Sequence, residues 1–403
     1  MAAGWVGVTV AMVALPHSLA IAIASGADPA RGLITAIIGG FIVYALGGSR
    51  VQIGGPTGAF IVVVFGVIAE HGYDGLVLAT FMAGLILLIA GGLHAGRLIQ
   101  LIPEPVINGF TIGIAIIIAT SQLKDLFGLT AEQVPAEFFA KLETLWGARV
   151  TLSPAALAIG VTAMILIVVL RRIFPRFPGL IVAIAAASAI VAAMGLPVDT
   201  IHSRFGDLPR TLPMPTVPFV SGARIVELLP SALVIAFLAG VESLLSAMVA
   251  DRMIAGRHRP NAELIAQGAA NLGSAFFGGL PATGAIARTA TNVRAGGKTP
   301  VAGIVHALAI LLVMLVAAPL AGFMAMPALA GLLILTAWNM CEFHRWKGYL
   351  KDRRSDQLLL VLTLVLTVIA DLTVAISVGV AVGLAIRLYR RDTPPSDWTE
   401  PHR

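Results

Sequence analysis

The stretch that decides the fold is FGGLPATGAIARTATNVR, Phe277–Arg294, read together with GGPTGAFI, Gly54–Ile61. The string Thr-Gly-Ala-apolar begins at Thr57 in one and at Thr283 in the other, an offset of 226 residues. In each copy a glycine pair and a proline precede the threonine, and an apolar run follows it. This order is typical of extended backbone that gives way to a helix start. We therefore predict two short helices that begin near Thr57 and Thr283.

Composition places these helices in a membrane. The 403-residue chain is 58% hydrophobic and 12% charged, and its mean hydropathy is +0.93. A soluble domain carries about twice that share of charge. Apolar runs of about 20 residues recur along the chain, which is enough for a helix to cross roughly 30 Å of hydrocarbon. We predict an all-α polytopic membrane protein. The single cysteine, Cys341, excludes a disulfide scaffold and a cysteine-rich zinc site.

Fourteen transmembrane spans are predicted, seven on each side of a proline-rich linker at about 196–224. They lie at about 4–25, 31–47, 56–70, 75–94, 104–122, 152–170, 178–195, 225–250, 262–278, 282–294, 300–318, 322–342, 356–371 and 373–390. The paired motifs fall in spans 3 and 10, so repeat one (about 1–195) and repeat two (about 225–391) are interpreted as structural repeats. Because seven is odd, the second repeat enters the membrane inverted. Inverted repeats with short, Gly- or Pro-interrupted spans indicate a transporter site.

The basic residues give an orientation. With both termini in the cytoplasm, most of the 27 lysines and arginines fall on inner loops or on the C-terminal end of the chain. We predict a multi-pass protein of a bacterial inner membrane, with anionic lipid rather than nucleic acid as the partner of its basic surface. Residues 124–150 are predicted to form either an interfacial amphipathic helix or a surface loop.

The two motifs together predict an anion site. If their helices enter from opposite sides, the helix N-termini meet near the midplane, and their unpaired N–H groups and partial positive charges favour an anion. Gly58 and Gly284 let a ligand approach the backbone, and the hydroxyls of Thr57 and Thr283 can cap a helix or donate to the ligand. Arg288 would add a full positive charge, or else it snorkels from a helix end. The alternative for both motifs is close packing of small residues between membrane helices.

Two further side chains are candidates for the same site. Glu242 lies inside the apolar run 235–250, where low dielectric favours the neutral carboxylic acid and suits it to proton coupling. It would bind a cation such as sodium if it stayed charged. The alternative is a neutral structural glutamic acid bonded to Ser243, Ser246 or a neighbouring helix. His17 follows Pro16, which is expected to break span 1, and it either lines the site or is structural. No cofactor and no metal site are expected, only a coupling proton or sodium ion.

These residues resemble the SulP anion transporters, solute carrier family twenty-six, over nearly all of residues 4–391. The similarity is most specific in LGGSRVQIGGPTGAF (46–60), GFTIGIAIIIATSQLKDLFGL (109–129), VESLLSA (241–247) and the block 261–306, with QGAANLGSAFFGG, ATGAIARTATN and GGKTPVAG. The resemblance implies a seven-plus-seven inverted repeat with half-helices at spans 3 and 10. It also implies a core domain (spans 1–4 and 8–11), a gate domain (spans 5–7 and 12–14), a homodimer and an elevator-like motion of the core.

The same resemblance assigns residues to roles. It carries Thr57, Ala59, Phe60, Ala287 and Arg288 over to the anion pocket. It also carries Glu242 over to the coupling position.

The chain departs from the family pattern in two places. Relatives usually carry a cytoplasmic STAS domain after the last span, whereas the residues that follow Arg391 are only DTPPSDWTEPHR (392–403). Either the chain is truncated or this member lacks regulation through that domain. In span 1, His17 and Ile21 stand where many relatives have a glutamine and an aromatic residue, which leaves the anion open among sulfate, bicarbonate, chloride and dicarboxylates.

The sequence therefore favours a secondary active transporter of a small anion, with proton symport as its coupling. A proton-coupled nucleobase symporter on a similar fold is the nearest alternative, but it would be expected to carry more acidic or amide groups at the starts of spans 3 and 10. An anion exchanger or a channel-like protein is a further alternative. An enzyme is not expected, since the spans contain no HExxH or GxSxG motif and no paired carboxylates.

Overall fold

The structure is a computed structural model that describes residues 2–97, 102–131, 134–174, 178–370 and 372–389. The predicted tail, 392–403, lies outside the described residues, as do residues 390 and 391. The α-helices and strands are α1 (Ala2–Ala24), α2 (Pro29–Ile34), α3 (Gly40–Leu46), β1 (Gly54–Gly55), α4 (Ile61–Gly92), α5 (Glu104–Phe127), α6 (Phe138–Gly147), α7 (Pro154–Ile173), α8 (Gly179–Met194), α9 (Ile201–Phe205), α10 (Gly222–Ile254), α11 (Pro260–Phe276), β2 (Thr283–Gly284), α12 (Ile286–Arg294), α13 (Val301–Gly322), α14 (Met326–Met340), α15 (Trp346–Tyr349), α16 (Arg354–Ile369) and α17 (Leu372–Tyr389).

Helix occupies every range predicted as a span, as far as those ranges are described. Spans 3 and 4 both fall in α4, which consists of two helical segments that meet at a kink at Gly72, where φ is 70° and ψ is 179°. Glycine reaches this backbone conformation without a Cβ clash, so the chain can turn there between two helical segments. Within the described residues, seven helices are long and apolar enough to cross a membrane, and three shorter helices are also apolar.

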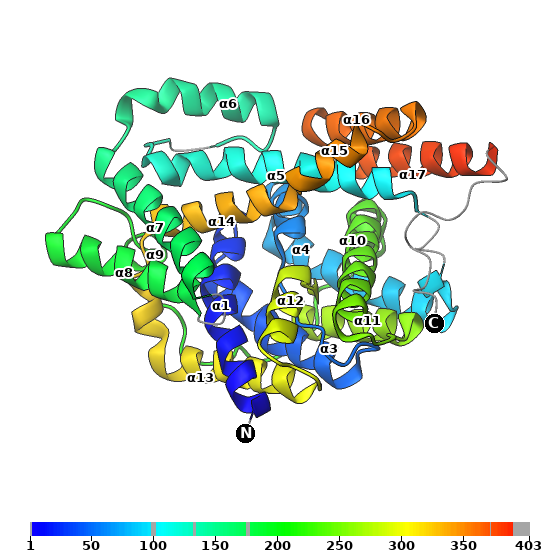
Figure 1. Ribbon diagram of the computed structural model, residues 1–403, viewed down its shortest axis with the longest axis horizontal. Helices are drawn as coiled ribbons and strands as arrows, with labels where there is room; N and C mark the ends of the chain where they lie inside the picture. The colour runs from blue at the N-terminus through cyan, green and yellow to red at the C-terminus, as the bar shows by residue number, and fades with distance from the viewer. Residues whose placement is uncertain (1, 98–101, 132–133, 175–177, 371, 390–403) are drawn as a thin grey trace.

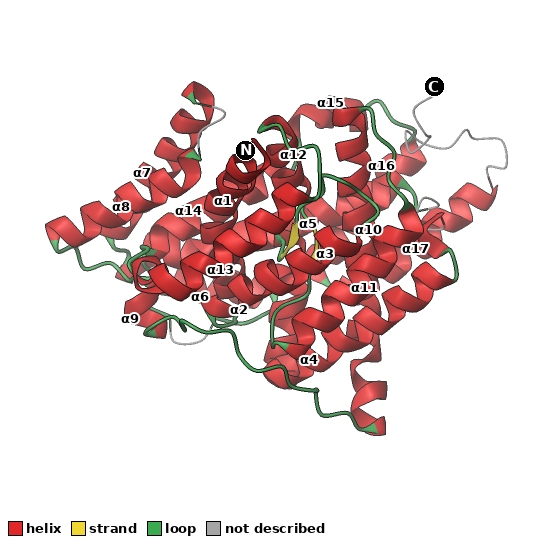
Figure 2. Ribbon diagram, turned by 90° about the horizontal axis from the view of Figure 1, so that it is seen from below, coloured by secondary structure: helices red, strands yellow, loops and turns green. Residues whose placement is uncertain are grey.

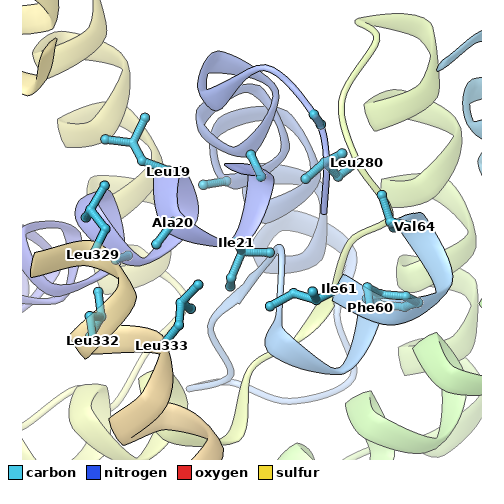
Figure 3. Packing of buried hydrophobic residues seen from close by; sticks show 14 of the residues in the cluster. Leu19, Ala20, Ile21, Phe60, Ile61, Val64, Leu280, Leu329, Leu332 and Leu333 are labelled. Atoms are coloured by element: carbon cyan, nitrogen blue, oxygen red, sulfur yellow. The ribbon is translucent and has the colours of Figure 1, made fainter. Parts of the chain in front are cut away.

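The predicted break at Pro16 was wrong, because α1 runs as one helix from Ala2 to Ala24. A proline removes one backbone hydrogen bond from a helix, and neighbouring helices can compensate for this loss. Here α1 packs against α2, α13 and α14. Figure 3 shows Leu329, Leu332 and Leu333 of α14 on one side of α1, with Ile61 on the other side, near Ile21.

The helices pack in two groups. In one group α4 packs against α10 and α11, and α1 packs against α2 and α13. In the other group α5 packs against α14 and α16, and α7 packs against α8 and α14 (Figure 1). Contacts of α1 with α8 and α14 connect the two groups. A site placed at α1 therefore lies where the two groups meet.

The two sequence motifs pair with each other. β1 and β2 run antiparallel, with Gly54 opposite Gly284 and Gly55 opposite Thr283, and Figure 2 shows the two short strands in the middle of the helices. A side chain at Gly284 would overlap the amide of Gln52. Glycine at position 284 therefore leaves room for the Gln52 side chain beside the strand pair.

This pairing corrects one predicted helix boundary. Thr283 and Gly284 are extended residues of β2, and α12 begins only at Ile286. On the other side, a 3₁₀ turn over Gly58–Phe60 leads directly into α4, close to the prediction. The second helix starts later because the backbone of Thr283 and Gly284 is engaged in the strand pair.

The segment predicted as either an amphipathic helix or a loop contains α6, of which Lys141 is buried. Its Nζ donates to Ser121 Oγ at 2.9 Å and lies 5.3 Å from the centre of the Phe65 ring. Burial lowers the pKa of Lys141. This lysine therefore connects α6 to both α5 and α4.

Candidate functional site

A cavity of about 450 Å³ opens beside the strand pair. Its lining includes residues that follow each strand, together with polar side chains from α1 and α10 that the sequence singled out. These residues are Thr57, Gly58, Ala59, Ala285, Ile286, Ala287, Arg288, His17 and Glu242. Two segments more than two hundred residues apart in the sequence thus share one wall of one cavity.

Arg288 crosses from the second motif to the first. Its side chain is only 4% exposed, and Nη2 donates to the carbonyl of Pro56. A Cβ on Gly55 would lie 2.7 Å from Nη1, so the glycine makes room for the guanidinium group. Nη1 is buried and has no hydrogen-bond partner among the described residues. A snorkelling arginine would place its charged group in water, whereas this group is held at the cavity wall.

Backbone donors lie close to this guanidinium. The 3₁₀ turn at Gly58–Phe60 and the first turn of α12 begin on the two sides of the strand pair. N–H groups in a first helical turn have no acceptor within their own helix, and the helix dipole adds about half a positive charge there. The geometry can therefore supply an anion with a charged donor and with backbone donors from both halves of the chain.

Glu242 lines the same cavity and is half-buried. Thr57 Oγ1 donates to Glu242 Oε2 at 2.7 Å, and this threonine makes no side-chain hydrogen bond to its own helix. The expected alternative partner, Ser243, instead donates to Glu263 at 2.8 Å. The carboxyl of Glu242 is thus connected directly to the first motif.

Three of the predicted site residues do not line the cavity described here. Phe60 is 1% exposed and packs in the hydrophobic core with Ile61 and Val64 (Figure 3). Thr283 is fully buried in β2, and its hydroxyl donates to the carbonyl of Ala239 at 2.9 Å. Gly284 is the other residue of β2. The 3₁₀ turn directs Phe60 into the core, and the strand pair keeps Thr283 and Gly284 behind the cavity wall.

Charged residues at helix ends line another part of the cavity. They are Glu104, Arg171, Arg252, Glu342 and Arg345. Arg345 pairs with Glu104 and, at 3.0 Å, with Glu342. Burial alone would lower the pKa of Arg345, but the hydrogen bond to Glu342 and the charge of Glu104 outweigh it and raise that pKa. The guanidinium of Arg345 therefore stays charged at the mouth of the cavity.

Sequence reasoning missed some polar residues in this region. Glu263 was not singled out, yet it is fully buried. It follows Pro260 in the first turn of α11, and an acid in that position normally indicates an ordinary helix start. Thr336 and Asn339 of α14 also line the cavity, although their sequence context is plainly apolar. The described residues contain no group of three or more His, Cys, Asp or Glu side chains that could hold a metal ion.

Comparison with known proteins gives a consistent picture. The model of the sulfate permease family matches residues 5–363. The chain is 41% identical over 359 residues to the "Putative sulfate transporter YvdB" of Bacillus subtilis (strain 168), with 89% of this chain and 68% of that protein covered. It is 32% identical over 336 residues to the "Bicarbonate transporter BicA" of Picosynechococcus sp., with 81% of this chain and 59% of that protein covered. The chain thus spans about two thirds or less of the length of these curated relatives.

Solved structures agree at the level of the fold. The transmembrane domain of a cyanobacterial bicarbonate transporter BicA superimposes with a TM-score of 0.83 at 29% identity, covering 95% of this chain and 96% of that chain. Murine Solute Carrier 26 family member A9, solved in the inward-facing state, gives a TM-score of 0.86 at 18% identity, covering 96% of this chain and 68% of that chain. At that identity the second likeness shows the fold alone.

Proposed function

Because this chain belongs to the sulfate permease family and is a multi-pass integral membrane protein, we propose that it is a secondary active transporter of a small anion. The family consists of transporters, so the chain is not an enzyme. Relatives are named as sulfate and bicarbonate transporters, which supports a substrate of the sulfate or bicarbonate class. A dicarboxylate is the third class that we include in the proposal.

The observation that carries the proposal is the position of Arg288. Its Nη2 donates to Pro56 of the first motif, while the buried Nη1, at the wall of the cavity, has no partner in the part of the chain that the structure describes. A buried charged donor without an acceptor costs free energy unless a ligand accepts a hydrogen bond from it. An anion held between the first turns of α4 and α12 would accept from Nη1 and from backbone N–H groups on both sides.

Glu242 is the proposed coupling residue. In the structure, the hydroxyl of Thr57 donates to Glu242 Oε2 at the edge of the proposed anion site. When the carboxyl takes up a proton it loses its negative charge, and the repulsion between Glu242 and an incoming anion disappears. Proton uptake and anion binding would then favour each other, which is the basis of symport.

The architecture suggests how the site reaches both sides of the membrane. We assign fourteen spans in a seven-plus-seven inverted repeat, with spans 1–4 and 8–11 as a moving core and spans 5–7 and 12–14 as a gate in a homodimer. The antiparallel strand pair supports the inversion. Arg171, Arg252 and Arg345, which line the cavity, lie at helix ends that the basic-residue pattern assigns to the cytoplasmic side. The cavity then opens inward, with both termini in the cytoplasm of a bacterial cell.

Uptake into proteoliposomes tests this function. Purified protein is reconstituted, and uptake of labelled sulfate, bicarbonate and a dicarboxylate is measured with an imposed proton or sodium gradient. Saturable uptake of one of these anions, concentrated by an inward proton gradient, is the expected result. Uptake that requires an anion on the opposite side would indicate exchange, and uptake of a labelled nucleobase instead would overturn the assignment.

A further inference from the structure

A second glutamate lies close to the site without lining the cavity. Glu263 of α11 is fully buried and accepts four hydrogen bonds. The backbone N–H groups of Gly48 and Ser49 donate to Oε2 at 2.9 and 3.2 Å. Ser243 Oγ and Gln267 Nε2 donate to Oε1 at 2.8 and 3.0 Å. One carboxyl group thus joins α10, α11 and the loop that leads into β1.

The direction of the bonds in this cluster follows from the orientations of the Gln52 and Gln267 amides. Backbone N–H groups and the amide nitrogen of Gln267 can only donate. The hydroxyl oxygen of Ser243 accepts from Gln52 Nε2 and from Gln267 Nε2, both at 2.8 Å, so its own proton is directed to Glu263. A protonated Glu263 would have to place its hydrogen against one of these donors. With these amide orientations, the four donors match an ionised carboxylate.

The loop held by this carboxylate carries the first motif into place. Gln52 donates to the carbonyl of Ser243 at 3.0 Å, and its amide lies against Gly284 of β2. At the next residue, the carbonyl of Ile53 accepts from the N–H of Ala285 at 2.8 Å, and the N–H of Ile53 donates to Thr289 Oγ1 at 2.9 Å. The bonds of Glu263 thus continue directly into the contacts that set β1 against β2 and α12.

The four donors to Glu263 are uncharged groups. A buried carboxylate held in this way contributes little to stability by itself, since the desolvation of its charge is expensive. A buried carboxylate instead favours one arrangement of its donors, because the displacement of any donor would remove a hydrogen bond from the buried charge. Two of the donors, Gly48 and Ser49, belong to the loop that leads to Pro56, whose carbonyl accepts from Arg288.

We propose that Glu263 is a positioning residue of the anion site: as a carboxylate held by four donors, it holds the register of β1 against β2 and so the placement of Pro56 relative to Arg288. The proposal rests on the anion-transport function argued above. It separates the two glutamates by role, since Glu242 changes protonation whereas Glu263 does not.

Hydrogen exchange on the full chain tests the geometric part without any transport. In Glu263→Gln, an amide NH₂ group replaces one of the two carboxylate oxygens, so the two donors to that oxygen lose their acceptor. Hydrogen exchange should therefore accelerate at least about tenfold at residues 48–55 and at 283–287. Glu70→Gln is the matched control, because the Glu70 side chain is 77% exposed. Unchanged exchange at 283–287 in a folded Glu263→Gln protein would overturn the proposal.

Uptake kinetics test the functional part, with labelled sulfate and bicarbonate as probes. Misplacement of the donors should raise the KM for the transported anion about tenfold in Glu263→Gln, with the pH dependence of uptake unchanged. If Glu263→Gln fails to fold, Ser243→Ala removes one donor and should raise KM less in the same direction. A loss of thermal stability with unchanged KM in these variants would assign Glu263 to stability alone. Absence of uptake by the wild-type protein would instead refute the transport function, and hydrogen exchange would still decide the positioning role.

Discussion

The two chain segments that meet at the centre of the molecule share a backbone plan but differ in chemistry. Each runs from a short strand into a helix, through the 3₁₀ turn at Gly58–Phe60 on one side and directly into α12 on the other. The second segment supplies the guanidinium of Arg288, whereas the first supplies the Pro56 carbonyl that receives it. The two similar segments therefore place a single guanidinium between them, rather than one charged side chain from each segment.

The matched threonines show the same division. Thr57 lines the cavity and donates to Glu242, whereas Thr283 is buried and donates to the carbonyl of Ala239. Identical positions in two similar motifs thus serve different purposes, because the helix that follows starts immediately in one and only at Ile286 in the other. The variants below test this asymmetry.

Arg288→Ala should produce the largest effect. A hydrogen bond to a charged group contributes about 1.5–3 kcal/mol, and 1.4 kcal/mol is a factor of ten, so the KM for the transported anion should rise by about ten- to a hundredfold. Concentration-dependent proteoliposome uptake measures it. Arg294→Ala, in the last turn of the same helix and exposed, is the control and should keep the wild-type KM. A wild-type KM in Arg288→Ala would remove this arginine from the site.

Glu242→Gln should abolish the response to a proton gradient. The amide cannot exchange a proton at working pH, so uptake should become equal with and without an inward proton gradient while binding persists. Uptake at a series of internal and external pH values provides the measurement. Glu227→Gln, on the same helix with a side chain that is 56% exposed, should retain the gradient response. Persistence of that response in Glu242→Gln would rule out Glu242 as the coupling residue.

Thr57→Val should have a smaller effect that combines affinity and coupling. It removes one hydrogen bond, worth about 1 kcal/mol, which corresponds to about a fivefold rise in KM. It also frees Glu242 from its donor, so the pH dependence of uptake should shift. Thr57→Ser restores the hydroxyl and should restore both properties. If the valine variant behaved like wild type in both assays, the link between Thr57 and Glu242 would have no role in transport.

Thr283→Val should have the smallest effect on transport. The lost hydrogen bond to Ala239 is buried in β2, so the expected cost is about 1 kcal/mol of stability, seen as a lower Tm. The KM should stay at its wild-type value, in contrast to Thr57→Val. Equal changes of KM in the two valine variants would contradict the asymmetry between the motifs.

Sequence patterns located most of the elements but not the contacts between them. The apolar runs predicted helix in every described span, because hydropathy and helix length are local properties. The proline at position 16 misled the prediction of α1, since packing against neighbouring helices keeps that helix continuous. Glu263 was overlooked for a related reason: its sequence neighbours indicate a solvated helix start, and its burial comes from Gly48 and Ser49, far away in the chain.

The sequence by itself determined that this chain is a helical membrane protein with a repeated Thr-Gly-Ala motif, because composition, run length and repetition are properties of the string. It also singled out Arg288 and Glu242, since charged residues inside apolar runs are visible without a structure. Only the tertiary structure decided which partner each would have. Four contacts join residues far apart in the chain. They are the pairing of β1 with β2, the hydrogen bond from Arg288 to Pro56, the hydrogen bond from Thr57 to Glu242 and the hydrogen bond from Gly48 to the buried Glu263. Such contacts depend on how helices pack, which no local pattern encodes.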